Sequence, residues 1–197
     1  LVLLVEPVLT LLALALGLGQ WMAEVDGRPY GIYVLPAVAA LAVVFIPFWE
    51  TAYGGFSRLK NASTYWAVLQ TPLTAQDIAT GEILWASAKG VVAGTFLLLI
   101  GMALGWASPS WSWFAIFALF PGAMFFAAVG LWAAAWVDRS TQLLMMQSFV
   151  LGPLALWSDT IFPFSRSGRW AEILTWISPV THVVRPIRRF CAGEISA

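Results

Sequence analysis

Long runs of apolar residues make up most of the chain, and short polar stretches separate them. A helix that crosses a bilayer needs about 20 mostly apolar residues. The runs that reach this length predict an all-α polytopic membrane protein with one domain over residues 1–197. Five transmembrane helices are expected, at about residues 1–22, 31–53, 84–106, 113–137 and 143–162.

The longest polar interruption, residues 54–83, lies between the second and third apolar runs. Tyr65 and Trp66 contribute to an aromatic face that is typical of a short amphipathic helix over residues 61–70. Pro72 ends that helix, and Thr74 is a favourable N-cap for a second helix starting at Ala75. Two hypotheses fit this pattern equally: the segment docks on a partner protein, or it is an interfacial helix anchored by Trp66.

Residues 163–190 do not form a simple apolar run. Apolar residues recur there at helical spacing and are interrupted at Ser178 and Pro179, which predicts a helix pair broken at that point. The pair is either an outer re-entrant hairpin or a marginal sixth span that carries Arg185, Arg188 and Arg189 inward. The positive-inside rule favours the span, whereas the polar interruptions and Pro179 favour the hairpin.

Composition supports the membrane class. The chain is 60% hydrophobic and only 10% charged, whereas soluble domains carry about 25% charged residues. Its formal net charge is zero and it has no basic stripe, which excludes nucleic acid as an expected partner. The lipid bilayer is therefore the expected environment of the chain.

Lysine and arginine in the short loops predict the orientation. Arg58 and Lys60 follow the second run and Arg139 follows the fourth. The loop after the first run has only Arg28, and the loop after the third has neither residue type. The N-terminus and residues 54–83 are therefore expected in the cytoplasm.

Charged residues near the membrane faces are candidates for function, because an ionised side chain at mid-bilayer costs at least about 2.5 kcal/mol. Glu6 and Glu50 lie near the predicted inner ends of the first two spans, and Asp159 lies near the outer end of the fifth. The glutamates form either interfacial contacts or part of a gate that grips the polar segment. Asp159 is either a structural cap or part of an exit path.

Motifs for catalysis are absent from the sequence. It contains no GxxxxGK[ST] phosphate loop, HExxH or GxSxG. His182 is the only histidine and Cys191 the only cysteine, so neither a metal site nor a disulfide is predicted. The chain is expected to be no enzyme and to carry no cofactor of its own.

Four motifs in order resemble the type-2 ABC transporter permeases, above all those that export nodulation factors (lipo-oligosaccharides), drugs and polysaccharides. They are FWETAYGGFSR at 48–58, LQTPL at 69–73, GEILW at 81–85, and IFPF at 161–164 with Trp170 and ISPVTH at 177–182. The resemblance extends from the first span to Arg188. Ser158-Asp159-Thr160 stands where this family more usually has an uncharged Ser-Gly pair.

The resemblance implies a six-span permease of the bacterial inner membrane that dimerises and binds two ABC ATPase subunits, which hold ATP and Mg. A leading amphipathic helix and a sixth span would lie beyond the two ends of this sequence. Residues 54–83 would hold the coupling helix, and residues 163–190 would form the re-entrant hairpin. Contact with the ATPase is expected at Arg58, Tyr65, Trp66, Leu69, Thr71 and Pro72.

The expected cargo is amphipathic, either a lipid-linked saccharide or a hydrophobic drug. Its path is assigned to Phe45, Trp49, Phe149 and Trp157, although helix packing or lipid contact also explains each of these aromatics. Two other classes remain open. An ion-gradient-driven transporter or channel needs a polar cluster at mid-membrane, and an intramembrane lipid enzyme needs His182 and Asp159 to converge.

Overall fold

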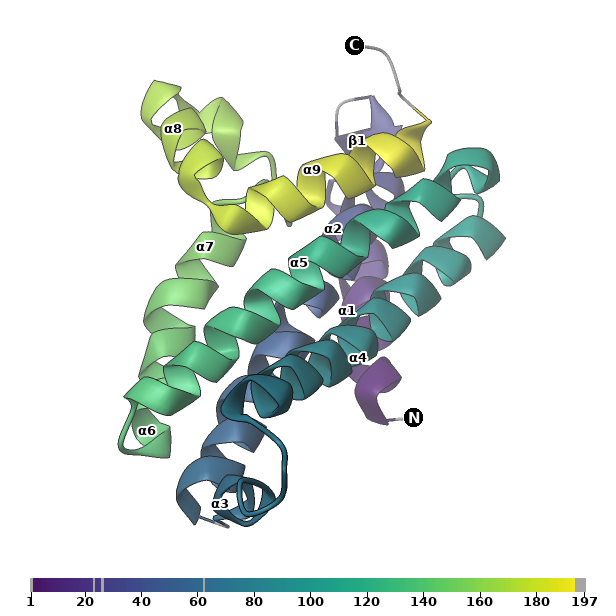
Figure 1. The fold of residues 1–197 in the computed structure, drawn as a ribbon. Coiled ribbons are helices and arrows are strands. Elements are labelled where there is room, and N and C mark those ends of the chain that lie inside the picture. Colours follow the sequence, from purple (N-terminus) through teal and green to yellow (C-terminus); the bar gives the residue numbers. More distant parts are fainter. Residues whose placement is uncertain (1, 23, 26, 62, 194–197) are drawn as a thin grey trace.

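The computed structural model describes residues 2–22, 24–25, 27–61 and 63–193, and helices dominate them (Figure 1). The all-α fold predicted from the sequence is confirmed; two strands of two residues each add a single short ladder in this part of the chain. The elements before the second long helix are α1 (Val2–Leu12), η1 (Ala13–Gly17), η2 (Leu18–Gln20), β1 (Glu24–Val25), β2 (Arg28–Pro29), α2 (Tyr30–Trp49), η3 (Glu50–Gly54), η4 (Ser57–Asn61) and α3 (Thr64–Val68). The remaining elements are α4 (Ala75–Ala103), α5 (Pro109–Trp136), α6 (Ser140–Met146), η5 (Gln147–Leu151), α7 (Gly152–Leu156), η6 (Phe164–Ser167), α8 (Arg169–Ile177) and α9 (Pro179–Ala192).

Three long helices pack against one another at the centre of the molecule: α2 with its continuation to Lys60, α4 and α5. They are 31, 29 and 28 residues long. At 1.5 Å per residue, even the shortest is about 42 Å long, which exceeds the bilayer core of about 30 Å. The most apolar part of α2 is 72% buried, against 39% for α4 and for α5. The helix α2 is therefore the central one.

Glycine allows these helices to approach closely. A Cβ atom on Gly130 of α5 would lie 2.6 Å from the carbonyl oxygen of Phe48 and would also collide with the hydroxyl of Thr51. Gly101 of α4 faces the side chain of Leu35 in the same way. The contact between α2 and each of its neighbours thus depends on the missing side chain.

The bundle has two ends, which we call the Tyr30 end and the Arg58 end. At the Tyr30 end, the backbone nitrogen of Ser108 donates to the carbonyl oxygen of Cys191 at 3.0 Å, which joins the α4–α5 loop to the end of α9. At the Arg58 end lie α3 and the turn between α5 and α6, where Lys60 Nζ is 3.7 Å from a carboxylate oxygen of Asp138. Figure 1 shows α3 at the bottom and α9 near the top.

Helix boundaries around the polar segment differ from the expected ones. The helix of α2 does not end near Gly54 but continues through η3 and η4 to Asn61. A Cβ atom on Gly55 would lie 3.2 Å from Leu131 of α5, so this glycine permits close packing and does not stop the helix. The helix predicted to begin at Ala75 after the Thr74 cap is present, and it continues without a break into the expected third span as α4.

The expected first and fifth spans are shorter than the other three. Among the described residues, three helices are long and apolar enough to cross a membrane, and Leu4–Gln20 is a shorter apolar helix. Residues 140–156 are helical through α6, η5 and α7, after which the chain turns at Trp157.

The helix pair predicted after the fifth run is present, and its break at Ser178 and Pro179 is confirmed. The hydroxyl of Tyr30 donates to the carbonyl oxygen of Ile161 at 3.0 Å, which places the start of this region at the Tyr30 end. Its last helix, α9, packs along α5 and returns to Ser108 (Figure 1). Residues 161–192 therefore enter and leave at the same end of the bundle.

Candidate functional site

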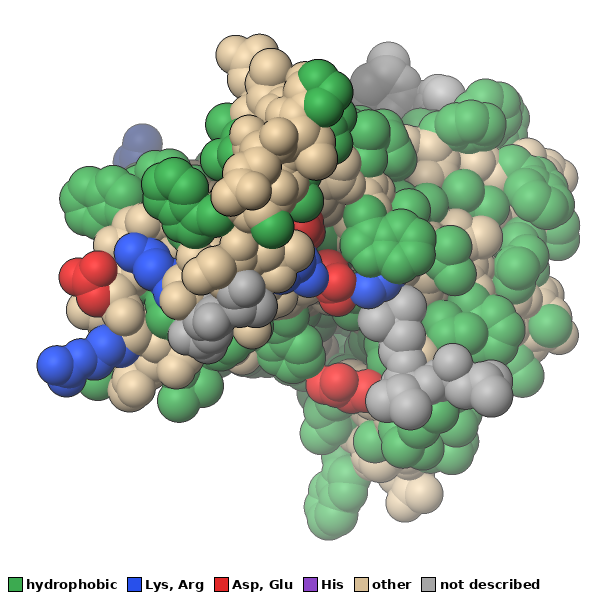
Figure 2. Space-filling model, turned by 60° about the horizontal axis from the view of Figure 1, so that its bottom comes forward, with side chains coloured by type: hydrophobic (Ala, Val, Ile, Leu, Met, Phe, Trp, Pro, Cys, Tyr) green, Lys and Arg blue, Asp and Glu red, His purple; other side chains and the backbone are tan. Residues whose placement is uncertain are grey.

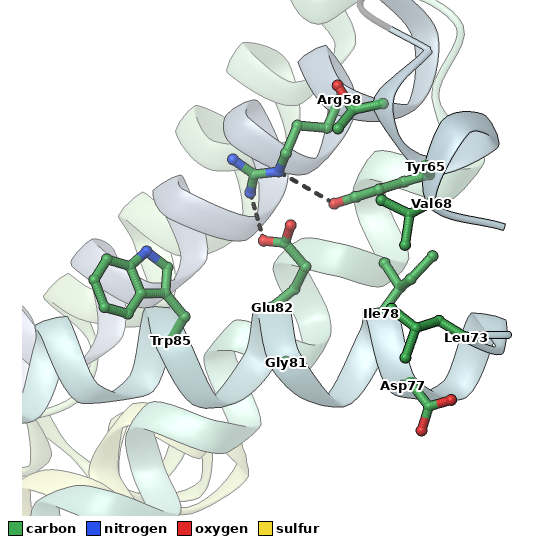
Figure 3. A pocket seen from close by; sticks show the side chains of 10 residues that line it. Arg58, Tyr65, Val68, Leu73, Asp77, Ile78, Gly81, Glu82 and Trp85 are labelled. Atoms are coloured by element: carbon green, nitrogen blue, oxygen red, sulfur yellow. Dashed lines mark hydrogen bonds and ion pairs between the residues drawn. The ribbon is translucent and has the colours of Figure 1, made fainter. Parts of the chain in front are cut away.

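The polar segment is held in place by a cluster of three side chains at the Arg58 end (Figure 3). A guanidinium nitrogen of Arg58 donates to Glu82 Oε2 at 2.5 Å, and Arg58 Nε lies 3.4 Å from the hydroxyl of Tyr65. The three residues come from η4, which continues the helix of α2, from α3 and from the second turn of α4. Their side-chain contacts therefore join three separate elements.

The Arg58–Glu82 pair is less accessible to water than an ordinary surface ion pair. The side chains of Arg58 and Glu82 are 31% and 14% exposed. Burial, together with the neighbouring Glu82 carboxylate, raises the pKa of Tyr65, so its phenol stays neutral at physiological pH. A neutral phenol can accept a hydrogen bond from the Arg58 guanidinium without adding another negative charge.

Local sequence explains how the segment turns between α3 and α4. The backbone nitrogen of Asp77 donates to the hydroxyl of Thr74 at 3.3 Å, and the carboxylate of Asp77 accepts from the Thr74 backbone nitrogen at 2.8 Å. This reciprocal pair is a capping box, and the predicted N-cap at Thr74 is confirmed. Pro72 lies in the exposed turn before it, and the Thr71 hydroxyl donates to the carbonyl oxygen of Val68 at 2.6 Å.

The short helix α3 has an inner and an outer face. Tyr65 and Val68 line a cavity of about 420 Å³ that faces Ile78 and Glu82 of α4 (Figure 3). Trp66 and Leu69 point away from it and are 66% and 40% exposed. The six residues expected to contact an ATPase thus divide: Arg58 and Tyr65 brace the segment, while Trp66, Leu69, Thr71 and Pro72 are exposed.

Charged side chains also gather at this end of the molecule. In Figure 2, with the lower part of Figure 1 turned forward, they form a band flanked by hydrophobic side chains. A second ion pair, between Lys89 Nζ and Glu50 Oε1 at 2.8 Å, joins α4 to η3. Lys89 also lies over the ring of Trp85, 4.8 Å from its centroid. Glu50 therefore connects two long helices and is not a free carboxylate.

A groove of about 750 Å³ lies between α1 and α2 and is mostly apolar. It brings together four residues singled out from the sequence, Glu6, Phe45, Trp49 and Glu50. The ring nitrogen of Trp49 is buried there and has no hydrogen-bond partner in the described part of the chain. The other two candidates for a cargo path lie elsewhere: Phe149 is 79% exposed and Trp157 is 37% exposed, and neither lines this groove.

Asp159 is a structural residue at the Tyr30 end. Its carboxylate accepts from the backbone nitrogen of Ser165 at 2.8 Å, and its carbonyl oxygen accepts from Tyr33 at 3.0 Å and from Arg188 at 2.6 Å. Its backbone is left-handed, with φ 54°, which explains why a glycine suits this position in the family pattern. Asp is one of the residues that tolerates this conformation.

The neighbour of His182 is Trp176. Its Nε2 atom lies 3.1 Å from the carbonyl oxygen of Trp176, and its ring packs against that tryptophan. The described contacts do not bring His182 to Asp159, as a lipid enzyme would need. Among the described residues, no group of three or more His, Cys, Asp or Glu side chains could hold a metal ion.

Sequence reasoning did not single out Glu82 or Lys89 as a site residue. Glu82, which pairs with Arg58, and Glu50, which pairs with Lys89, both stand within or beside apolar helical sequence. A carboxylate in that setting needs a partner, which is the signal that could have identified the two pairs. The sequence spacing alone does not say which cation each one meets.

Comparison with known proteins decides the class. The sequence model of the ABC-2 type transporter family matches residues 1–189. The chain belongs to this family. This ABC-2 protein is similar to Nodulation protein J of Sinorhizobium fredii, at 30% identity over 185 residues, which cover 94% of this chain and 71% of that relative. It is 28% identical over 195 residues to Nodulation protein J of Neorhizobium galegae, covering 97% and 73% of the two chains.

No solved structure matches this ABC-2 protein. The resemblance to type-2 ABC transporter permeases is confirmed by the family match and by the relatives. The chain is thus a multi-pass membrane subunit of an ABC transporter, and its family is one that partners an ATPase subunit.

Proposed function

We propose that this chain is the permease of an exporter in which a separate subunit binds ATP and Mg and hydrolyses the ATP. Two copies of the permease and two ATPase subunits would form the complex in a bacterial inner membrane. The N-terminus and the Arg58 end would face the cytoplasm, and the cargo would be an amphipathic molecule such as a lipid-linked saccharide or a hydrophobic drug.

The observation that carries this proposal is the braced helix α3 with two exposed apolar side chains. Trp66 and Leu69 are exposed at the end of the molecule that carries the Lys60–Asp138 pair, where no lipid tail would cover them in the proposed orientation. Tryptophan in such a position is the residue type most often found at the energetic centre of a protein interface. Because its family partners an ATPase subunit, the proposed contact of these two side chains is with an apolar groove on that subunit.

The cluster of Arg58, Tyr65 and Glu82 connects the proposed ATPase contact on α3 to the long helices. Tyr65 on the inner face of α3 meets Arg58, and Arg58 meets Glu82. Because Arg58 continues α2 and Glu82 belongs to α4, a movement of α3 acts on two of the three long helices. We infer that this cluster is the coupling element between the ATPase and the cargo path.

The groove between α1 and α2 is the proposed entrance of that path. It combines the rings of Phe45 and Trp49, whose centroids are 6.0 Å apart, with the carboxylate of Glu6 at its edge. Such a mixture suits a molecule with an apolar part and a polar part. Transport driven by an ion gradient is less well supported, because Glu50 is already paired with Lys89.

Co-purification with the ATPase subunit tests the proposal. We expect the double variant Trp66→Glu/Leu69→Glu to lose the ATPase during purification, because it places charge on the apolar contact without touching the bracing cluster. Gln70→Glu/Gln76→Glu is the matched control, since both residues are exposed in the same segment and the pair gains the same two negative charges. Full retention of the ATPase by the double variant would remove the docking role of α3.

A further inference from the structure

Four arginines surround one pocket at the Tyr30 end, far from the candidate coupling site. The pocket has a volume of about 490 Å³, and its lining includes Arg28, Arg185, Arg188 and Arg189. Neither Asp nor Glu is among its lining residues within the described part of the chain. We refer to it as the arginine pocket.

Strand register explains how Arg28 reaches this pocket. In the ladder between β1 and β2, Val25 is opposite Arg28 and Glu24 is opposite Pro29. Successive side chains on a strand point to opposite faces, so Val25 and Arg28 share one face and Glu24 points to the other. Val25 and Arg28 both line the pocket, whereas Glu24 is exposed. The strand register thus places Arg28 at the pocket.

The other three arginines lie on one face of α9. Residues three and four positions apart are neighbours on a helix surface, so Arg185 stands next to both Arg188 and Arg189. Like charges at this spacing destabilise a helix. Aromatic rings hold two of the guanidinium groups in place: Arg185 lies 4.3 Å from the ring centroid of Trp176 and Arg188 lies 4.2 Å from that of Tyr33.

Among the described residues, Arg188 is held by a backbone carbonyl oxygen and an aromatic ring, and none of these contacts is with a carboxylate. One of its terminal nitrogens donates to the backbone carbonyl oxygen of Asp159, and its buried Nε has no hydrogen-bond partner in the described structure. The carboxylate of Asp159 accepts from the backbone of Ser165. A buried N–H of a charged group is costly to leave without an acceptor, which points to a ligand that supplies one.

We propose that the arginine pocket binds a phosphate group. Guanidinium groups pair with phosphate through parallel N–H···O bonds, and several converging arginines are the usual protein solution for this anion. Loops on the outer side of a membrane protein generally carry few arginines. The positive-inside rule therefore does not explain why four arginines lie at the proposed outer end. The phosphate belongs either to an anionic lipid headgroup or to free phosphate, and this site is additional to the proposed transport function.

The test uses the purified full chain in an uncharged detergent. Its melting temperature is measured alone and with dioctanoyl phosphatidic acid, with inorganic phosphate, or with dioctanoylglycerol, which has the same acyl chains but no phosphate. We expect a phosphate-containing probe to raise the melting temperature and dioctanoylglycerol to leave it unchanged. Stabilisation by phosphatidic acid alone assigns the site to a lipid headgroup, and stabilisation by inorganic phosphate as well assigns it to free phosphate.

Variants connect the effect to the pocket. Arg185→Gln/Arg189→Gln should weaken binding of the active probe at least tenfold, and Arg139→Gln/Arg169→Gln, which removes two charges outside the pocket, should bind normally. Arg189→Gln alone changes an exposed residue and should weaken binding about threefold if the double variant does not fold. Absence of stabilisation by both phosphate probes, or equal weakening in the two double variants, would overturn the proposal.

Discussion

Arg58 and Glu82 form an ion pair at 2.5 Å although 24 positions separate them in the chain. The pair joins the last turn of the helix that begins with α2 to the second turn of α4. The pair thus connects the two ends of the polar segment, and the contact between Tyr65 and Arg58 holds α3 against it. The position of the exposed face of α3 thus depends on one pair of opposite charges.

Charge reversal should therefore uncouple the transporter, and a double reversal should restore it. Arg58→Glu or Glu82→Arg leaves a half-buried charge beside a like charge, and we expect each to lower the unfolding free energy by about 1–2 kcal/mol. Each should also reduce retention of the ATPase. The variant carrying both substitutions should recover most of both quantities, measured by thermal melting and co-purification. Recovery of neither would mean that the pair does not position α3.

Substitutions at Asp159 give a second prediction, because they separate the effect of its left-handed backbone from that of its side-chain hydrogen bond. Asp159→Ala removes the acceptor for Ser165 and leaves the left-handed backbone without the short polar side chain that makes this conformation tolerable, at a cost of about 2–3 kcal/mol. Asp159→Gly relieves the backbone and should cost about 1 kcal/mol. Asp159→Asn keeps both features and should stay within about 1 kcal/mol of the parent.

The order of these three variants in thermal melting is the informative result. If Gly proved as harmful as Ala, the left-handed backbone would not matter at this position. If Asn proved worse than Gly, the hydrogen bond to Ser165 would need a charged acceptor.

Two glycines in long helices should respond in opposite directions. Gly130→Ala places a methyl group against the Phe48 carbonyl oxygen and the Thr51 hydroxyl, and should destabilise by about 1–3 kcal/mol. Gly81→Ala meets no atom within 4 Å and should stabilise by about 0.5–1 kcal/mol, because alanine favours helix. Thermal melting of both in the same detergent checks this, and similar melting temperatures would contradict the packing of α5 on α2.

Orientation is tested by labelling single cysteines with a membrane-impermeant maleimide. The native thiol of Cys191 is only 4% exposed, so it is first replaced by serine. Ser110→Cys at the Tyr30 end should be labelled in intact cells, whereas Gln70→Cys at the Arg58 end should react only after permeabilisation. Both positions are exposed, which makes them matched reporters. The reverse pattern would place the Arg58 end outside and exclude its contact with an ATPase.

Local chemistry made part of this structure predictable. Thr74 was identified as an N-cap because its hydroxyl can accept from the first turn of a helix, and the break at Pro179 follows from the missing backbone N–H of proline. Both features depend only on residues a few positions apart. The resemblance of ordered motifs supplied the family.

Contacts between distant segments were not predictable. Gly54 and Gly55 have the appearance of a helix end, yet the helix continues because Gly55 lets Leu131 of α5 pack closely. Glu82 was overlooked as a site residue because nothing in the spacing connects it to Arg58. Of the four aromatics assigned to a cargo path, Phe45 and Trp49, four positions apart on one helix, line the groove together, while Phe149 and Trp157 lie outside it.

The unbroken helix that starts with α2 has a mechanical consequence. It runs for 31 residues from Tyr30 to Lys60, which corresponds to about 46 Å. Tyr30 and Tyr33 near its first turn hold the carbonyl oxygens of Ile161 and Asp159, and Arg58 near its last turn holds Glu82. A 46 Å lever tilting by about 5° around its midpoint displaces each tip by about 2 Å. In the proposed orientation, a push by the ATPase at the Arg58 end would therefore reach the opposite face of the bilayer as a displacement of the Ile161 loop, carried by the helix itself.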